Sequence, residues 1–292
     1  MVATPDRPEL LAIVGPTASG KSDLAMKIAK EFNGEIIAAD SWTVYKGFDI
    51  GTGKPSPADQ KAVKHYLIDV REANQGFNAP LFQEMANQAI ADIQKRSKLP
   101  ILVGGTGLYI DSVLYNFGFL DNSTPEERQK LDEMELEDLL KMAANQHIDL
   151  TEVDQRNKRR VIRAIESKGQ RPIKKKLRPN TLIIGLWPDA EELKQQIEKR
   201  IDKMLTAGLE QEAKELANKY GWEAEPMKGI GYREWQDYFI GTQALKETRQ
   251  RIVSATNNLA KRQRTWFKRN PDIHWFGSTE QAYDYVSAIL NT

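Results

Sequence analysis

Eight residues near the start of the chain have the types and spacing needed to hold a phosphate group. Residues 15–22 read GPTASGKS and satisfy the pattern G-x-x-x-x-G-K-[ST] at every fixed position. They follow an apolar run and precede an amphipathic helical pattern, which is the context that a phosphate-binding loop requires. In such a loop, backbone N–H groups and a helix N-terminus surround the phosphate oxygens. The predicted phosphate-binding residues are Gly15, Pro16, Thr17, Ala18, Ser19, Gly20, Lys21 and Ser22.

Two of these residues have side chains with distinct predicted roles. The ammonium group of Lys21 is expected to reach the terminal phosphate, and the Ser22 hydroxyl is expected to bind Mg²⁺. The alternative is a chance match in a turn between a strand and a helix. The motif leaves open which phosphate compound is bound.

The motif does not identify the carboxylate that would act opposite this loop. Ordinary P-loop ATPases place a magnesium-organising aspartate after a hydrophobic strand, but the apolar run Leu99–Val103 is followed by Gly104-Gly105-Thr106-Gly107. The other candidates are Asp40 and Asp69, each of which follows an apolar stretch. Asp40 would lie at the carboxyl end of a core strand, where open α/β sheets bind ligands. It is predicted to be a base that takes a proton from an acceptor, and a turn aspartate is the alternative.

The elements that position these residues alternate between strand and helix. Apolar strands are predicted at 10–14, 35–39, 99–103 and 181–186, with helical patterns at 24–32 and 79–96 between them. A long helix after Asp189 carries Leu193, Ile197, Ile201 and Leu205 on one face, and a second long helix repeats Leu245, Ile252, Leu259 and Trp266 every seven residues. This alternation predicts an α/β fold with a P-loop NTPase-like parallel sheet covered by helices.

Composition excludes several classes of protein. The chain of 292 residues has 40% hydrophobic and 28% charged residues, no cysteine and three histidines, so disulfides, thiolate zinc sites and cysteine nucleophiles are excluded. No apolar run approaches the roughly 20 residues needed to cross a bilayer, and residues 1–10 have no signal-peptide core. We therefore expect a cytoplasmic protein without membrane association.

Charge is balanced overall but segregated locally. Residues 121–154 contain 11 acidic and 3 basic residues, whereas residues 156–178 contain 11 basic residues and one glutamate. Residues 244–270 hold 8 basic residues and one glutamate. The first two blocks lie in a segment without a convincing strand, which predicts a helical insertion at 119–177 within a core formed by 1–118 and 178–292. Two basic blocks this unbalanced favour binding to nucleic acid over solvated helix faces.

The order of several motifs resembles one known family. These are GPTASGKS (15–22), ADSWTVYKGFDIGTGKP (39–55), HYLIDV (65–70), LVGGTGLYI (102–110), RRVIRAIE (159–166), KRIDKML (199–205), KGIGYREW (228–235) and LAKRQRTWF (259–267). Together they span most of the chain and resemble the tRNA dimethylallyltransferases, the bacterial enzymes most of all. That family transfers a dimethylallyl group from dimethylallyl diphosphate to N6 of adenosine 37 in tRNA, with release of diphosphate and help from Mg²⁺.

The resemblance implies catalytic roles for Asp40, Lys21, Arg200 and Thr17. The loop would hold the diphosphate of the allylic donor, and Asp40 would accept a proton from the adenine amine. Arg200 matches the family's diphosphate-binding arginine, although its place on a helix alone would favour a surface ion pair. The charge that develops on the departing diphosphate would be stabilised by Lys21, Arg200, backbone N–H groups and Mg²⁺.

The resemblance also implies a set of tRNA contacts. The insertion at 119–177 would bind the anticodon stem-loop, the helix at 244–270 would add phosphate contacts, and the protein would act as a monomer. Thr43 stands where the family commonly has glutamine. The predicted tRNA-binding residues are Asp40, Ser41, Trp42, Thr43, Thr106, Arg128, Arg159, Arg160 and Arg163.

Three other functions remain open from the residues. An isopentenyltransferase acting on free adenine nucleotides would share the phosphate loop but would not need two basic blocks. A P-loop phosphotransferase acting on a small molecule would hold ATP, and the lack of an acid after Leu99–Val103 argues against it. A non-catalytic RNA-binding module would need the basic blocks alone.

Overall fold

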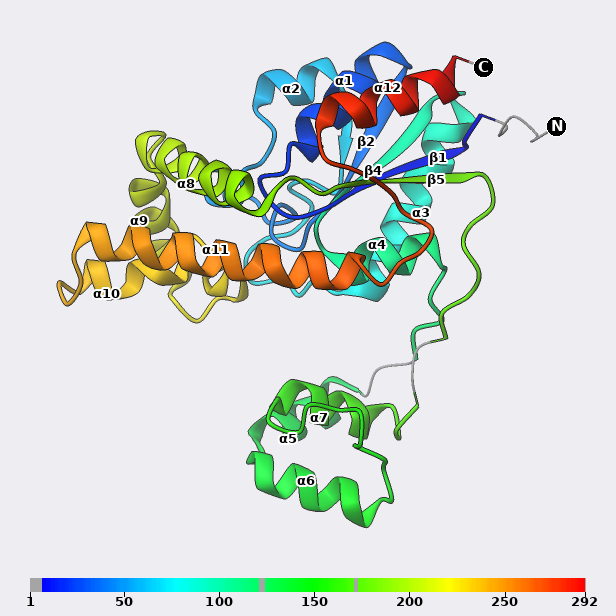
Figure 1. Ribbon diagram of the computed structural model, residues 1–292. Coiled ribbons are helices and arrows are strands. Elements are labelled where there is room, and N and C mark those ends of the chain that lie inside the picture. Colours follow the sequence, from blue (N-terminus) through cyan, green and yellow to red (C-terminus); the bar gives the residue numbers. More distant parts are fainter. Residues whose placement is uncertain (1–6, 121–123, 171–172, 292) are drawn as a thin grey trace. The chain divides into compact units, whose positions relative to one another are not determined.

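A parallel β-sheet forms the centre of the chain. The computed structural model describes residues 7–120, 124–170 and 173–291. In these ranges six strands are hydrogen-bonded in the order β3-β2-β4-β1-β5-β6, all parallel to their neighbours (Figure 1). The strands are β1 (Leu10–Val14), β2 (Gly34–Ala39), β3 (His65–Tyr66), β4 (Leu99–Gly104), β5 (Thr181–Leu186) and β6 (His274–Phe276). The predicted parallel α/β sheet is confirmed, and β3 and β6 are too short to have given a pattern of their own.

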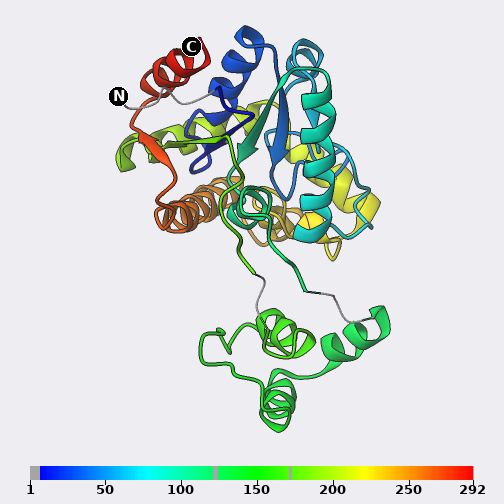
Figure 2. The same ribbon diagram turned by 90° about the vertical axis from the view of Figure 1, so that its right-hand side faces the viewer.

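Helices cover both faces of this sheet. Helices α1 (Lys21–Glu31) and α12 (Thr279–Leu290) pack against each other on one face, and α3 (Ala79–Lys95) packs with α4 (Gly107–Leu114) on the other. Figure 2 shows α12 in red and α3 in cyan on opposite sides of the strands. A short helix, α2 (Pro57–Ala62), precedes β3. Because the strands are covered on both faces, β1, β4 and most of β2 are buried along their length.

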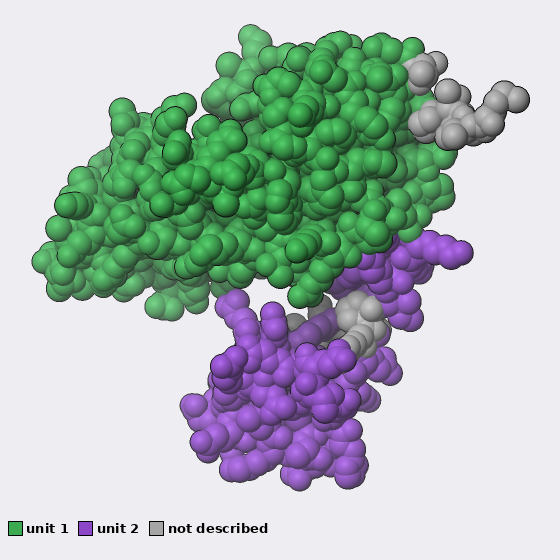
Figure 3. Space-filling model, in the orientation of Figure 1, with its two compact units in different colours: residues 1–114, 177–292 green, residues 115–176 purple. Residues whose placement is uncertain are grey.

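The chain divides into two compact units, which Figure 3 colours separately. The first contains residues 1–114 and 177–292, and the second contains residues 115–176. The segment expected from sequence to form the insertion is 119–177. Residues 1–6, 121–123, 171–172 and 292 lie outside the described ranges, so the predictions for residues 1–10 and for the two charge blocks of the insertion are tested only in part.

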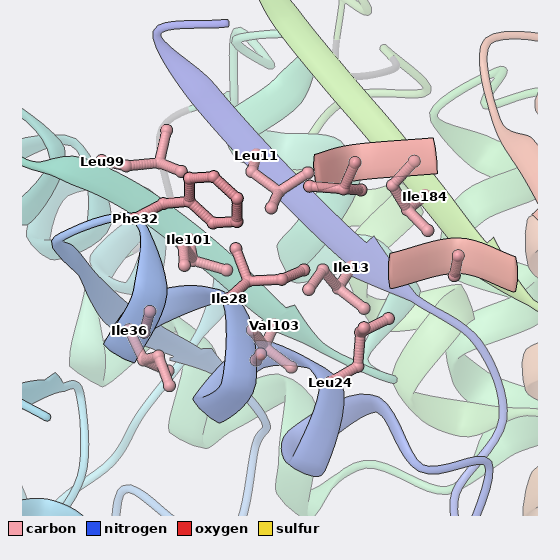
Figure 4. Close-up of a cluster of buried hydrophobic side chains, with 14 of the residues drawn as sticks. Leu11, Ile13, Leu24, Ile28, Phe32, Ile36, Leu99, Ile101, Val103 and Ile184 are labelled. Atoms are coloured by element: carbon pink, nitrogen blue, oxygen red, sulfur yellow. The ribbon is translucent and has the colours of Figure 1, made fainter. Parts of the chain in front are cut away.

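Alternating side chains of the strands build the core that holds the phosphate loop. Leu11 and Ile13 of β1 pack with Ile101 of β4 and with Leu24 and Ile28 of α1, and all five are at most 2% exposed (Figure 4). Burial of each such side chain contributes about 1.5–3 kcal/mol of stability. The two ends of the loop, in β1 and α1, are therefore fixed by one core.

A second core lies among the helices that follow β5. Helices α8 (Ala190–Thr206), α9 (Leu209–Tyr220) and α11 (Leu245–Phe267) pack with the segment after β2, which contributes Tyr45 and Phe48. Three short helices, η1 (Glu225–Lys228), η2 (Arg233–Trp235) and α10 (Gln236–Phe239), join α9 to α11. The predicted face of α8 is confirmed for Leu193, Ile197 and Ile201, and Leu205 is partly buried.

The seven-residue repeat did not identify the buried face of α11. Of its four positions only Ile252 is buried, while Leu245 and Trp266 are more than 40% exposed. The buried face instead runs through Thr248, Ile252, Val253, Thr256, Ala260, Gln263 and Phe267.

The second unit is helical within the described residues. Its helices are α5 (Pro125–Glu133), α6 (Leu136–Asn145) and α7 (Lys158–Glu166), and the range 124–170 contains no strand. Leu139 of α6 and Val161 and Ile162 of α7 are fully buried and form the centre of a small core. No helix within the described residues of either unit has the length and apolar character needed to span a bilayer.

Candidate active site

The phosphate loop lies at the carboxyl end of the central strand β1 and leads directly into α1. Residues 15–20 connect the two elements, and Lys21 and Ser22 are the first residues of the helix. Gly15 has φ +142°, and a Cβ at this position would lie 2.7 Å from the carbonyl oxygen of Leu186 in β5. Only glycine fits this approach of two backbones, so the first glycine of the motif fixes where the loop begins.

Lys21 is the cationic centre of this loop. Its side chain is buried, and Nζ donates to the carbonyl oxygen of Pro16 and lies 3.5 Å from the Ser19 hydroxyl. The pKa of Lys21 is lowered to about 7, chiefly by burial and also by the charge of Arg200, while the charge of Asp40 opposes both effects. Three of the four predicted catalytic side chains, Lys21, Arg200 and Asp40, are therefore close enough for their charges to interact. Within the described ranges the hydrogen-bond partners of the ammonium group are neutral.

Arg200 reaches this region from α8. It is partly buried, and its Nη2 donates to the carbonyl oxygen of Thr52 over 3.2 Å. Burial lowers the pKa of Arg200, and the charges of Asp40 and Asp23 oppose that effect. Among the residues that the structure describes, no carboxylate forms an ion pair with Arg200. The surface ion pair that its helical position suggested is therefore not present in the described ranges.

Asp40 follows β2 and adopts the turn geometry considered as its alternative role. Its Oδ1 accepts hydrogen bonds from the backbone N–H groups of Trp42 (2.8 Å) and Thr43 (3.3 Å). This Asx-type turn fixes the orientation of the carboxylate. Its Oδ2 accepts no hydrogen bond from any described residue, so one oxygen shapes the turn and the other is free to accept a proton.

The neighbours of Asp40 differ in their exposure. Ser41 and Trp42 are partly exposed, whereas Thr43 is only 7% exposed and its hydroxyl lacks a hydrogen-bond partner in the described part of the chain. Thr106 begins the turn into α4, where its carbonyl accepts from Tyr109 and Ile110, and its N–H lies 3.4 Å from the carbonyl oxygen of Ala39. Since Ala39 precedes Asp40, the structure brings Thr106 next to the strand that carries the predicted base.

Gln263 of α11 is a site residue that sequence reasoning missed. It is 9% exposed, and its Oε1 accepts a hydrogen bond of 2.8 Å from the N–H of Thr17 in the phosphate loop. The two residues are 246 positions apart, so no local pattern links them. The available signal was a polar side chain within an otherwise amphipathic helical pattern.

The predicted RNA-binding arginines of the second unit fall into two groups. Arg128 of α5 and Arg163 of α7 both approach the buried carboxylate of Glu166 in α7, at 3.1 and 3.6 Å, so the contact of Arg128 joins α5 to α7. Arg159 and Arg160 lie on the exposed side of α7. The second group has the exposure that contact with an RNA backbone requires.

The basic residues of α11 and its C-terminal end also fall into two groups. Arg249 and Arg251 are paired with Asp202 and Asp237, and Arg264 donates to the carbonyl oxygen of Pro188. The other five are exposed and have no carboxylate partner in the described ranges: Lys246, Lys261, Arg262, Lys268 and Arg269. Uncompensated cations along one helix form an electrostatic footprint for a polyanion.

The residues around the loop fit a magnesium ion that is shared with a bound phosphate compound. The Ser22 hydroxyl is exposed and makes no hydrogen bond within the described ranges, so its oxygen is available as a ligand. No cluster of three or more acidic or histidine side chains suited to a metal occurs among the described residues. This donor set matches Mg²⁺, which keeps most of its shell as water and phosphate oxygens.

Comparisons with known proteins place the chain in one family. The model of the IPP transferase family matches residues 43–270, more than three quarters of the chain. A tRNA dimethylallyltransferase of Pediococcus pentosaceus is 41% identical over 284 residues, covering 92% of this chain and 90% of its own length.

Solved structures agree with this match. The crystal structure of a full-length tRNA isopentenylpyrophosphate transferase from Bacillus halodurans has a TM-score of 0.74 and 33% identity, and the alignment covers 97% of this chain and 96% of that one. The structure of a eukaryotic dimethylallyltransferase acting on tRNA has a TM-score of 0.78 and 26% identity, and the alignment covers 96% of this chain and 76% of that one. These likenesses support the predicted P-loop NTPase-like fold. The chain therefore belongs to the IPP transferase family, the family of the tRNA dimethylallyltransferases.

Proposed function

We propose that this protein transfers a dimethylallyl group from dimethylallyl diphosphate to N6 of adenosine 37 in tRNA. One observation carries the proposal: a buried lysine in a phosphate loop interacts electrostatically with both Arg200 and Asp40 at the carboxyl edge of the sheet. Two cations beside a carboxylate suit a reaction in which an anionic group leaves and a proton is removed. Family membership supports the same reaction.

The bond changes assign a role to Asp40. The N6 amine attacks C1 of the dimethylallyl group, the C1–O bond breaks, and its electron pair leaves with the diphosphate. The amine gives up one proton, which Oδ2 of Asp40 accepts while the N–H groups of Trp42 and Thr43 hold Oδ1. General-base help of this kind is worth about 10²- to 10⁴-fold in rate.

The departing diphosphate determines the other roles. Lys21, Arg200 and the loop N–H groups from Ala18 to Ser22 stabilise the negative charge that develops on it, because preorganised donors act more strongly in a site shielded from water. The Thr17 N–H donates to Gln263 instead and anchors the loop to α11. The Ser22 hydroxyl would hold Mg²⁺, which would supply further positive charge beside the departing diphosphate.

The acceptor is proposed to be the anticodon stem-loop. The exposed cations of α11 and the Arg159–Arg160 pair of α7 are suited to RNA phosphates, and Ser41, Trp42 and Thr106 lie near Asp40, where the base must arrive. Adenosine 37 must leave its stack to react, so the base is flipped out of the loop.

Arg128 and Arg163 hold Glu166, and direct contact of either with tRNA stays a prediction. Cytoplasmic location and action as a monomer also stay predictions.

A transfer assay tests this function. Purified protein is incubated with dimethylallyl diphosphate, Mg²⁺ and an unmodified tRNA transcript with adenosines at positions 36, 37 and 38. The expected product carries one dimethylallyl group on N6 of adenosine 37, and a transcript with guanosine at position 37 is the control. AMP competes in a parallel reaction. Absence of modified tRNA, or preference for AMP over tRNA as acceptor, would contradict the proposal.

A further inference from the structure

A carboxylate outside the site described above organises a backbone segment that continues into the contact with Arg200. Glu212 of α9 accepts hydrogen bonds from three consecutive backbone N–H groups, those of Asp49 (3.2 Å), Ile50 (2.8 and 3.0 Å) and Gly51 (3.0 Å). Successive N–H groups that point into one concavity form a nest for an anion. Here the anion is part of the protein, so the shape of the segment 49–51 depends on the Glu212 side chain.

The position of this carboxylate is itself fixed. The Tyr232 hydroxyl donates to Oε1 of Glu212 over 2.7 Å, and Tyr232 is 1% exposed. Burial and the Glu212 charge both raise the pKa of Tyr232, so its hydroxyl remains a donor at neutral pH. The helix that carries Glu212 is anchored in the second core through Leu209 and Ala213, both fully buried. A rigid element therefore presents the carboxylate to the segment 49–51.

The same segment continues into the contact with Arg200. The Gly53 N–H donates to the carbonyl oxygen of Ile50 over 3.0 Å, which closes the turn. The Thr52 carbonyl at the tip of this turn accepts from Arg200 Nη2 at 3.2 Å. Gly53 has φ +66°, and a Cβ there would collide with the same Nη2 atom. The guanidinium thus packs directly on the turn whose other end is held by Glu212.

The turn and Arg200 also share a cavity. Ile50, Gly53 and Arg200 are among the residues that line a space of about 560 Å³. Since Arg200 pairs with no carboxylate in the described ranges, the Thr52 carbonyl is its fixed protein acceptor there. A change in the shape of the turn would therefore move the guanidinium.

We propose that Glu212 is a positioning residue for the diphosphate of the donor. By filling the nest at 49–51 it sets the turn at 52–53, and this turn holds Arg200 in place to bind the departing diphosphate. Glu212 touches no substrate and acts through Arg200. The proposal rests on the proposed function for the role of Arg200.

Glu212→Gln tests this role with little change in size. An amide has one acceptor oxygen and an NH₂ group, which would oppose the N–H groups of the nest. The Kd for inorganic pyrophosphate is expected to rise about tenfold. The KM for dimethylallyl diphosphate is expected to rise with it, while the KM for tRNA stays unchanged. Glu215→Gln is the matched control, because Glu215 lies on the same helix and contacts only the exposed Gln211 among the described residues.

A double-mutant cycle distinguishes positioning from a general loss of structure. In an Arg200→Ala background, Glu212→Gln is expected to weaken pyrophosphate binding by less than about twofold, because the residue through which it acts is gone. The proposal would be overturned if the Kd of the double mutant rose by the full product of the two separate factors. It would also be overturned if Glu212→Gln left the Kd for pyrophosphate unchanged. Should Glu212→Gln fail to fold, Tyr232→Phe removes one hydrogen bond from the same carboxylate, and a Kd for pyrophosphate equal to that of the wild type would overturn the proposal.

Pyrophosphate binding separates this proposal from the proposed function. A wild-type protein that binds pyrophosphate but does not modify tRNA would contradict the transfer reaction, and the cycle would still report on Glu212. A wild-type protein that binds no pyrophosphate would overturn both.

Discussion

Lys21 is a buried ammonium group whose hydrogen-bond partners are neutral oxygen atoms. Its pKa of about 7 reflects the loss of hydration and the nearby charge of Arg200. A bound diphosphate would supply the missing negative charge and raise this pKa again. Binding of the donor and protonation of Lys21 are therefore coupled.

This coupling predicts a pH dependence of pyrophosphate binding. Above pH 7 the free protein increasingly carries neutral Lys21, so each binding event must take up a proton and affinity must fall as pH rises from 7 to 9. Calorimetry in buffers of different ionisation enthalpy measures the proton uptake. Lys21→Met is expected to bind weakly and to lose this part of the uptake. If the wild type and Lys21→Met took up the same number of protons on binding pyrophosphate, Lys21 would not be the group that is protonated.

The two oxygens of Asp40 allow a clean substitution. Asp40→Asn keeps an acceptor for the N–H groups of Trp42 and Thr43 but removes the base. We expect kcat to fall by about 10²- to 10⁴-fold. Pyrophosphate binding should be unchanged or tighter, because a negative charge near Lys21 is lost. A variant with wild-type kcat would show that another group accepts the proton.

At the scale of elements, contiguous patterns were predictable and long-range contacts were not. Residues 15–22 and Asp40 could be placed because each lies beside an apolar strand with a strong local signal. Gln263 and Glu212 could not, since each acts on a segment more than 150 positions away. The buried face of α11 does not follow its large apolar residues, because the helix packs through polar and small side chains such as Thr256 and Ala260.

The contact between α11 and the phosphate loop leads to a stability prediction. Gln263→Leu removes the acceptor for the Thr17 N–H and leaves a partly buried donor without this partner. The free energy of unfolding should fall by about 1–3 kcal/mol, as measured by chemical denaturation. Gln250→Leu, an exposed position on the same helix, should change it by less than about 0.5 kcal/mol. Equal effects of the two substitutions would mean that this hydrogen bond does not hold the loop.

At the scale of the whole molecule, a net charge of +1 conceals separate cationic surfaces. The first unit carries exposed cations on α11, and the second carries Arg159 and Arg160 on α7. The basic blocks were visible in the sequence, but which cations are internally paired was not. That distinction required the positions of Asp202, Asp237 and Glu166.

Salt dependence tests these surfaces. The logarithm of the tRNA association constant should fall steeply with the logarithm of salt concentration, because phosphate contacts release counterions. Replacing both Arg159 and Arg160 by alanine should weaken tRNA binding and reduce the slope by about one to two, without changing the Kd for pyrophosphate. The paired Arg251→Ala is the control and should leave the slope nearly unchanged. A flat salt profile in the wild type would exclude these cations as the RNA footprint.

The central claim is that the loop at residues 15–22 binds a diphosphate that departs intact from an allylic carbon. The most direct measurement uses dimethylallyl diphosphate labelled separately in C1 and in its phosphorus atoms, with unmodified tRNA and Mg²⁺. We predict that the carbon label enters the tRNA and that all of the phosphorus label appears as inorganic pyrophosphate, in equal amounts and without ATP. Phosphorus label in the tRNA, or release of single phosphate from ATP under the same conditions, would contradict the account.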